Sequence, residues 1–153
     1  MNDLDLAIEY PEKAVETALK IRVKDTPAYA ADLGLLANLY GEKGQYKLSK
    51  KLLRQSLSIL KSNLHESHQD VTNIYVYLSE VFDHENMPDS SLHYSILAYS
   101  VNALLPVDLQ FRRNYYTKQL AEGYFKNGRL DSAKLYMDKL LSTNGLIGPI
   151  YSD

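Results

Sequence analysis

The stretch that decides the fold runs from residue 30 to residue 60 and reads AADLGLLANLYGEKGQYKLSKKLLRQSLSIL. Apolar residues up to Tyr40 recur at helical spacing on one face. Gly41 and Gly44 then interrupt the pattern and indicate a turn after a helix end. A second apolar stripe follows, from Leu48 to Leu60. Two amphipathic helices joined by a short turn are expected to form an antiparallel hairpin.

This hairpin pattern recurs with a period of 42 residues. The first-helix residues that repeat are Leu36, Ala37 and Tyr40, then Leu78, Ser79 and Phe82, then Leu120, Ala121 and Tyr124. The turn position is Gly44, then Asn86, then Gly128, three residues that tolerate left-handed backbone geometry. A small residue in the second helix recurs as Ser49, Ser91 and Ala133. A fixed period with large, small and turn residues in phase predicts stacked helical units.

These residues resemble the tetratricopeptide repeat, in which Leu-Gly-x-x-Tyr in the first helix is followed by a small residue in the second. The segment from Leu36 to Ser49 carries this pattern, although the usual period is about 34 residues. The longer period, with residues 18–21 (ALKI) before the link and residues 68–71 (HQDV) after it, is similar to the kinesin-light-chain subclass. The resemblance implies an all-α, right-handed solenoid of antiparallel helical hairpins.

We expect one domain over residues 1–153, divided into a lone helix or half repeat (1–24), three repeats (27–63, 68–105 and 108–142) and an irregular tail (143–153). Pro11 predicts that the first helix either starts there or is kinked there. Thr26 and Pro27 suit the cap and the first position of the next helix. Ser67 with Asp70 resembles a capping box, and Asp108 is a further expected cap.

The composition is that of an ordinary soluble protein, with 45% hydrophobic residues, 24% charged residues and a net charge of −2. A strong basic surplus, which nucleic-acid binding would favour, is absent. With no apolar run of about 18 residues and no signal peptide, we expect a soluble, cytoplasmic chain without membrane contact. The absence of cysteine excludes disulfides, thiolate metal sites and a cysteine nucleophile but does not fix the compartment. The basic run at residues 47–54 is interpreted as a solvated outer face, with contact to an acidic partner as the alternative.

The sequence predicts no enzyme, no metal site and no cofactor. It contains neither a Gly-x-Ser-x-Gly elbow nor a phosphate-binding glycine loop. His65 and His68, with Glu66 and Asp70, have metal-ligand chemistry, but a polar loop followed by a helix cap explains them better.

The resemblance implies a concave groove lined by the first helices of the hairpins, and this groove is the predicted binding site. Aromatic residues that lie off the apolar stripe offer contact area there. The candidate partner-binding residues are Asn38, Tyr77, Glu80, Asp83, Tyr115, Lys118, Glu122, Phe125 and Lys126. Members of this family that clamp a peptide's terminal carboxylate use basic groove residues, but Glu80 and Glu122 would repel an acidic tail. We therefore expect a protein or peptide partner that is apolar or mildly basic.

Two other functions remain open at this point. One is a regulatory or sensor input domain of a larger bacterial-type signalling protein, a role in which similar repeats occur. The other is a self-assembling module that forms homo-oligomers through exposed ends of the stack, with Leu146, Ile147, Ile150 and Tyr151 folding back or inserting into a neighbour.

Overall fold

The computed structural model describes residues 3–20, 24–64, 68–104 and 110–143. These residues form seven α-helices and no strand. The helices are α1 (Asp3–Lys20), α2 (Pro27–Glu42), α3 (Tyr46–Asn63), α4 (Gln69–His84), α5 (Pro88–Ala103), α6 (Gln110–Lys126) and α7 (Leu130–Thr143). Residues 65–67, Asp108 and the predicted tail beyond Thr143 lie outside the described residues.

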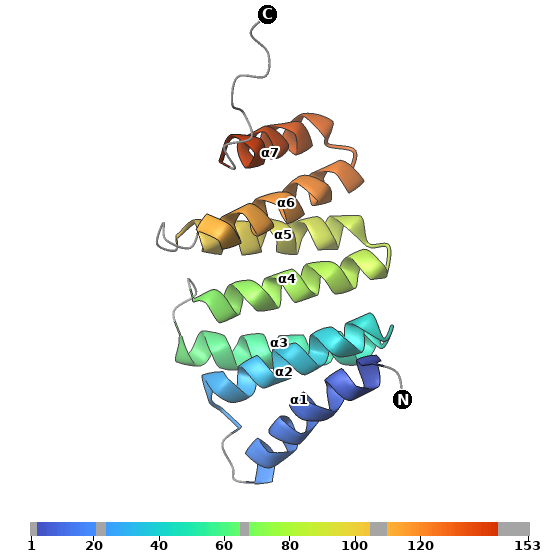
Figure 1. Ribbon diagram of the computed structural model, residues 1–153, viewed down its shortest axis with the longest axis vertical. Helices are drawn as coiled ribbons and strands as arrows, with labels where there is room; N and C mark the ends of the chain where they lie inside the picture. The colour runs from blue at the N-terminus through green and yellow to red at the C-terminus, as the bar shows by residue number, and fades with distance from the viewer. Residues whose placement is uncertain (1–2, 21–23, 65–67, 105–109, 144–153) are drawn as a thin grey trace, which may run out of the picture.

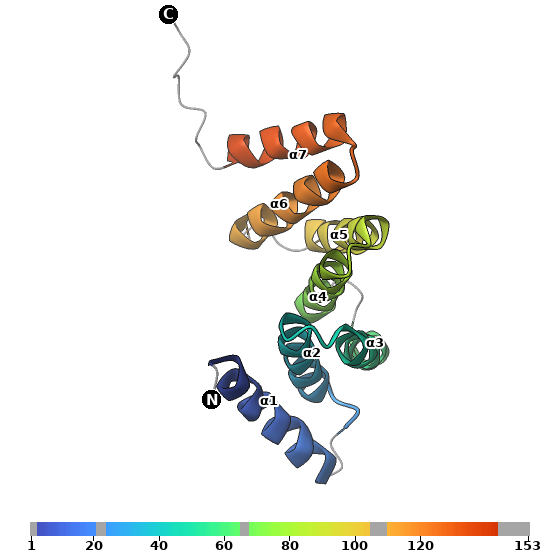
Figure 2. The same ribbon diagram turned by 90° about the vertical axis from the view of Figure 1, so that its right-hand side faces the viewer.

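Helices α2 to α7 pair as three antiparallel hairpins that stack along the long axis of the molecule (Figure 1). Helix α1 packs against α2. Turned by 90°, the stack shows α2, α4 and α6 succeeding one another on one side, with α3 and α5 on the other (Figure 2). The predicted all-α solenoid of helical hairpins is thus confirmed.

The turns within the hairpins have the backbone geometry that the repeat phase predicts. Gly44 has φ 78°, Asn86 has φ 55° and Gly128 has φ 69°. Gly41, however, does not end its helix, since α2 continues to Glu42. Gly41 matters for packing instead, because a Cβ placed on it would lie 3.0 Å from Val81 Cγ2 of α4.

The helix starts agree with the sequence at α2 but not at α1. Tyr29 N donates to Thr26 Oγ1 over 3.3 Å, and Pro27 is the first residue of α2. Helix α1 continues through Pro11, so a helix start at this proline is wrong; the proline is fully buried, and packing offsets its missing hydrogen bond. The predicted capping box involves Ser67, which lies outside the described residues; within them, His68 is the N-cap of α4, and its Nδ1 accepts from Asp70 N over 3.2 Å.

The core repeats with the same period as the sequence. Leu36, Leu78 and Leu120 are all buried, as are the aligned small residues Ser49, Ser91 and Ala133. Where helices approach closely, serine hydroxyls bond to backbone carbonyls: Ser56 Oγ donates to Ala30 O over 2.6 Å. Small side chains thus let neighbouring helices come close, and at Ser56 the buried hydroxyl is also hydrogen-bonded.

The basic run on α3 is not uniformly solvated. Lys50 is largely buried: its Nζ lies 2.5 Å from Glu85 Oε2 and 5.1 Å from the centre of the Phe82 ring. This lysine therefore joins the first hairpin to the second, while Lys47, Lys51 and Arg54 are exposed.

We expect Gly44→Ala to lower the free energy of unfolding by about 1 kcal/mol, because alanine, unlike glycine, is strained at positive φ. Urea denaturation followed by circular dichroism measures this change. Gln55→Ala, at an exposed position of α3, is the control and should alter stability by less than about 0.5 kcal/mol. Equal stability of both variants and the wild type would show that the turn is not held in this conformation.

Candidate functional site

Four of the predicted groove residues fall on two parallel lines that cross α2, α4 and α6: Asn38, Glu80, Glu122 and Lys126. One line consists of Asn38, Glu80 and Glu122, which are spaced by the 42-residue period. The other lies four residues further along each helix and consists of Glu42, His84 and Lys126. Residues four apart lie on the same helix face. The repeat therefore places two rows of polar side chains side by side along the stack.

A pocket of about 240 Å³ lies where α2 meets α4. Its polar lining residues are Asn38, Glu42, Glu80 and His84. Asn38 Nδ2 donates to Glu42 Oε1 over 3.3 Å and so holds that carboxylate at the rim. The arrangement offers two carboxylates to a cationic group of side-chain size.

Glu80 is the electrostatic centre of this surface. Tyr115 Oη donates to Glu80 Oε1 over 3.0 Å, and no described lysine or arginine forms an ion pair with Glu80. Burial is the main cause that raises the pKa of the Glu80 carboxyl, and the negative charges of Glu42 and Asp83 raise this pKa further. The hydrogen bond from Tyr115 and the nearby His84 lower the pKa, but the net shift is upward. The folded chain thus carries a desolvated carboxylate at an open pocket.

The two lysines predicted for the groove already have acidic partners. Lys126 of α6 pairs with Asp83 of α4, and Lys118 lies 3.6 Å from Glu122 on its own helix. All four side chains are partly solvated, so these pairs contribute little stability but cancel local charge. The excess charge of the groove is therefore negative and lies around Glu42 and Glu80.

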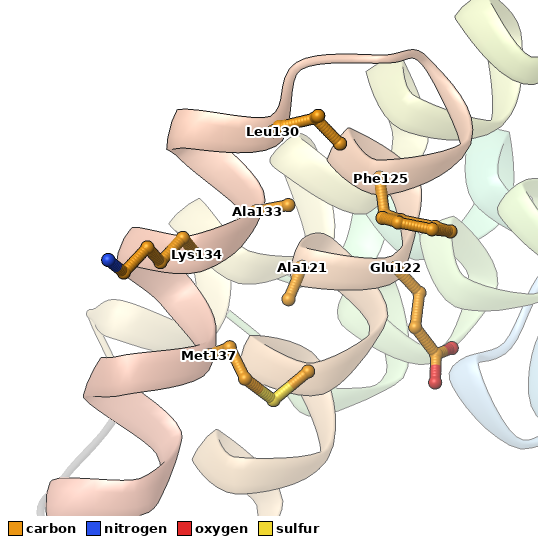
Figure 3. A pocket seen from close by; sticks show the side chains of 7 residues that line it. All are labelled: Ala121, Glu122, Phe125, Leu130, Ala133, Lys134 and Met137. Carbon is orange, nitrogen blue, oxygen red and sulfur yellow. The ribbon is translucent and has the colours of Figure 1, made fainter.

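The three predicted aromatic residues have different surroundings. Tyr77 is half-buried and packs against the core, where burial is the main cause of its raised pKa, ahead of the nearby Glu80 charge. Tyr115 is 43% exposed, and burial of its hydroxyl together with Glu80 raises its pKa. Phe125 is 66% exposed and lines a separate pocket between α6 and α7, together with Glu122 (Figure 3).

The structure thus brings Asn38, Glu80, Asp83, Tyr115 and Lys126 together along α2, α4 and α6. Lys118 lies beside this group, and Phe125 lies outside it. Sequence reasoning missed Glu42, His84 and Gln119, of which the first two line the pocket and the third reaches Tyr115 Oη over 3.4 Å. Each lies four residues after a predicted residue, so helical spacing could have found all three.

Two further features of the described residues bear on function. Nowhere in these residues do three His, Cys, Asp or Glu side chains gather as a metal ion would require, although His65 and Glu66 fall in an undescribed segment. None of the seven helices has both the length and the apolar character needed to cross a membrane.

We expect Glu80→Gln to raise the free energy of unfolding at pH 7 by about 0.5 kcal/mol, because glutamine accepts from Tyr115 without a buried charge. The ordinary pKa of a glutamate carboxyl is 4.5, and the pKa of Glu80 is raised above it in the folded state. The wild-type carboxyl therefore contributes to stability below pH 4.5, and this contribution is lost as the pH rises through the folded pKa. The gain should therefore vanish at about pH 4.

Denaturation at pH 4 and pH 7 tests this prediction, with Glu9→Gln as the control. Lys13 lowers the pKa of Glu9, so its replacement should bring no gain at pH 7. Loss of stability in Glu80→Gln at pH 7 would contradict the prediction.

Comparison with known proteins identifies the repeat. A sequence model of the tetratricopeptide repeat family matches residues 33–62, which span the end of α2, the first turn and most of α3. A search of curated proteins finds no match. Tetratricopeptide repeats in general mediate contacts between proteins.

Solved structures match over nearly the whole chain at low identity. BtubC (BKLC) from P. vanneervenii aligns with 98% of this chain at a TM-score of 0.83 and 14% identity. This chain spans 60% of the length of that protein. Two structures of a Podosopora anserina protein, described as a kinesin light chain with nearly identical TPR-like repeats, align at TM-scores of 0.79 and 0.80 with 19% identity. They cover 94% and 96% of this chain, which in turn covers 68% and 70% of theirs.

The predicted resemblance is therefore confirmed. The chain contains a tetratricopeptide repeat at residues 33–62, and its fold as a whole is that of the TPR-like solenoids found in kinesin-light-chain-type proteins.

Proposed function

We propose that the protein is a non-catalytic scaffold that binds an extended or helical peptide along α2, α4 and α6. The observation that carries this proposal is the Glu80 carboxylate, which is desolvated and lines an open pocket beside Glu42. A buried charge without a cationic partner lowers stability, and its retention is typical of a functional site. The general role of tetratricopeptide repeats in contacts between proteins supports the same conclusion.

The partner presents a lysine or arginine to the pocket between α2 and α4. Its ammonium or guanidinium group would meet Glu42 and Glu80, and removing water from this pocket strengthens their attraction. An acidic peptide is disfavoured, because Lys118 and Lys126 already pair with Glu122 and Asp83.

Apolar residues of the partner pack beside this cation. Tyr115 offers an exposed ring whose hydroxyl is held by Glu80, so little side-chain entropy is lost on binding. Tyr77 lies on the neighbouring helix, half-buried against the core. The recognised peptide thus combines one cation with neighbouring apolar side chains.

Selection from a random peptide library tests this function. Peptides selected on the wild type should be enriched in lysine or arginine next to apolar residues. The Glu42→Gln, Glu80→Gln double variant should lose this enrichment and bind the selected peptides about tenfold to a hundredfold more weakly, since charge-assisted hydrogen bonds are lost.

The matched control is the double variant Glu9→Gln, Glu16→Gln, which changes net charge equally but on the exposed surface of α1. It should bind selected peptides as the wild type does. If both double variants reduce binding equally, net charge rather than the pocket explains the affinity. If no peptide is enriched, the groove is not a peptide site.

A further inference from the structure

The end of the stack formed by α6 and α7 carries an open, mainly apolar face. Its pocket of about 380 Å³ is lined by Ala121, Glu122, Phe125, Leu130, Ala133, Lys134 and Met137 (Figure 3). Met137 extends from α7 toward α6, while Lys134 points outward at the rim (Figure 3). We call these seven residues the terminal face. No described helix lies over it.

The same surface exists on the two preceding hairpins, where the next helix covers it. Helix α4 packs on both α2 and α3. Helix α6 packs on α5 and reaches α4 through the side-chain contacts of Tyr115 with Glu80 and of Lys126 with Asp83. Leu53, Ser95 and Met137 occupy one repeat position and are 0%, 3% and 40% exposed. This position is thus buried under both covering helices and partly exposed on the terminal face.

We propose that the terminal face binds an amphipathic helix of a partner polypeptide. This helix would lie on α6 and α7 in the same position that α4 and α6 take on the hairpins that precede them, so it would continue the two internal interfaces. The covering helices are 16 and 17 residues long, which sets the length of helix that the face accommodates. This surface differs from the groove pocket, which lies between α2 and α4.

The charge of the bound helix follows from Lys50. This lysine pairs with Glu85 at the end of α4 and lies over the ring of Phe82 three residues earlier. Lys134 occupies the same repeat position on α7. The partner helix therefore carries an aromatic residue and, three positions later, a carboxylate that meets Lys134.

Two other positions of the partner helix follow in the same way. Glu80 accepts a hydrogen bond from Tyr115 of the covering helix α6, and Glu122 is the counterpart of Glu80 on the terminal face. Tyr115 lies nine residues before Tyr124, the aromatic of α6, so the partner helix is expected to carry a tyrosine nine residues before its aromatic. Phe125 of the terminal face occupies the repeat position of Gly41, against which Val81 of α4 packs. Because the phenylalanine ring fills this space, the partner-helix residue equivalent to Val81 must be small. The recognised helix has the pattern Tyr-x₇-small-aromatic-x₂-Glu.

The chain itself supplies a probe with almost this pattern. Helix α6 contains Tyr115, Gly123 and Tyr124 at the required spacing, with Asn127 in place of the glutamate. We would use a labelled peptide of residues 110–128 that carries Asn127→Glu, and a control peptide that carries Asn127→Lys. Fluorescence anisotropy with the full-length chain measures both affinities.

The glutamate peptide should bind about fivefold more tightly than the lysine peptide, and Lys134→Glu should reverse this order. Met137→Glu should weaken both peptides by about tenfold or more, because it places a charge in the apolar contact. Met87→Glu, at a 44% exposed position in a turn, is the matched control and should change neither affinity. Circular dichroism checks that each variant remains folded.

Four outcomes would overturn the proposal. Binding that is lost in the Glu42→Gln, Glu80→Gln variant but unchanged in Met137→Glu would assign the peptide to the groove. Binding only after deletion of residues 144–153 would make that segment the occupant. Self-association in sedimentation that Met137→Glu abolishes would make it a second copy. Absence of binding by both the full and the shortened chain rejects a helix site altogether.

Discussion

Every helix in this stack depends on the close approach of each hairpin to the next. That approach is possible because small residues lie where helices meet. A Cβ on Gly34 would lie 2.4 Å from Ile74 Cδ1, and one on Gly123 would lie 3.3 Å from Leu92 Cδ1. A single hairpin cannot bury its own apolar face, so the contact between hairpins, rather than the hairpin itself, is the unit that stabilises the fold.

The same contact positions the groove. Because α2, α4 and α6 occupy equivalent places in successive hairpins, residues 42 apart in sequence become neighbours in space. Glu80 lies between Asn38 on one side and Tyr115 on the other as a result. Its partly buried carboxylate opposes folding, while it supplies the charge that a basic partner would recognise. Stability and recognition thus make opposite demands on one side chain.

A solenoid repeats its interfaces, so the surface at its end can be compared with the equivalent surfaces inside the stack. The terminal face has the position, and in part the residues, of two surfaces that are covered elsewhere in the same chain. Lys134 matches Lys50, and Glu122 matches Glu80. The internal interfaces therefore serve as a template for the helix that would bind there, independently of the groove.

The sequence by itself determined the features that depend on neighbouring residues. The positive φ at Gly44, Asn86 and Gly128, the seven helices and the cap at Thr26 follow from local backbone preference and from the period of apolar residues. The aligned leucines were predictable as core for the same reason. The two rows of groove residues also follow from the period, although one row was only partly recognised.

Only the tertiary structure decided the features that depend on residues far apart in the chain. Gly41 remains helical because Val81 packs against it, Pro11 remains inside α1 because it is buried, and Lys50 leaves solvent because Glu85 and Phe82 face it. Equally, sequence gave no reason for Lys126 to pair with Asp83 while Glu80 meets only a tyrosine. Charge pairing is set by distances between helices, and those distances exist only once the hairpins are packed.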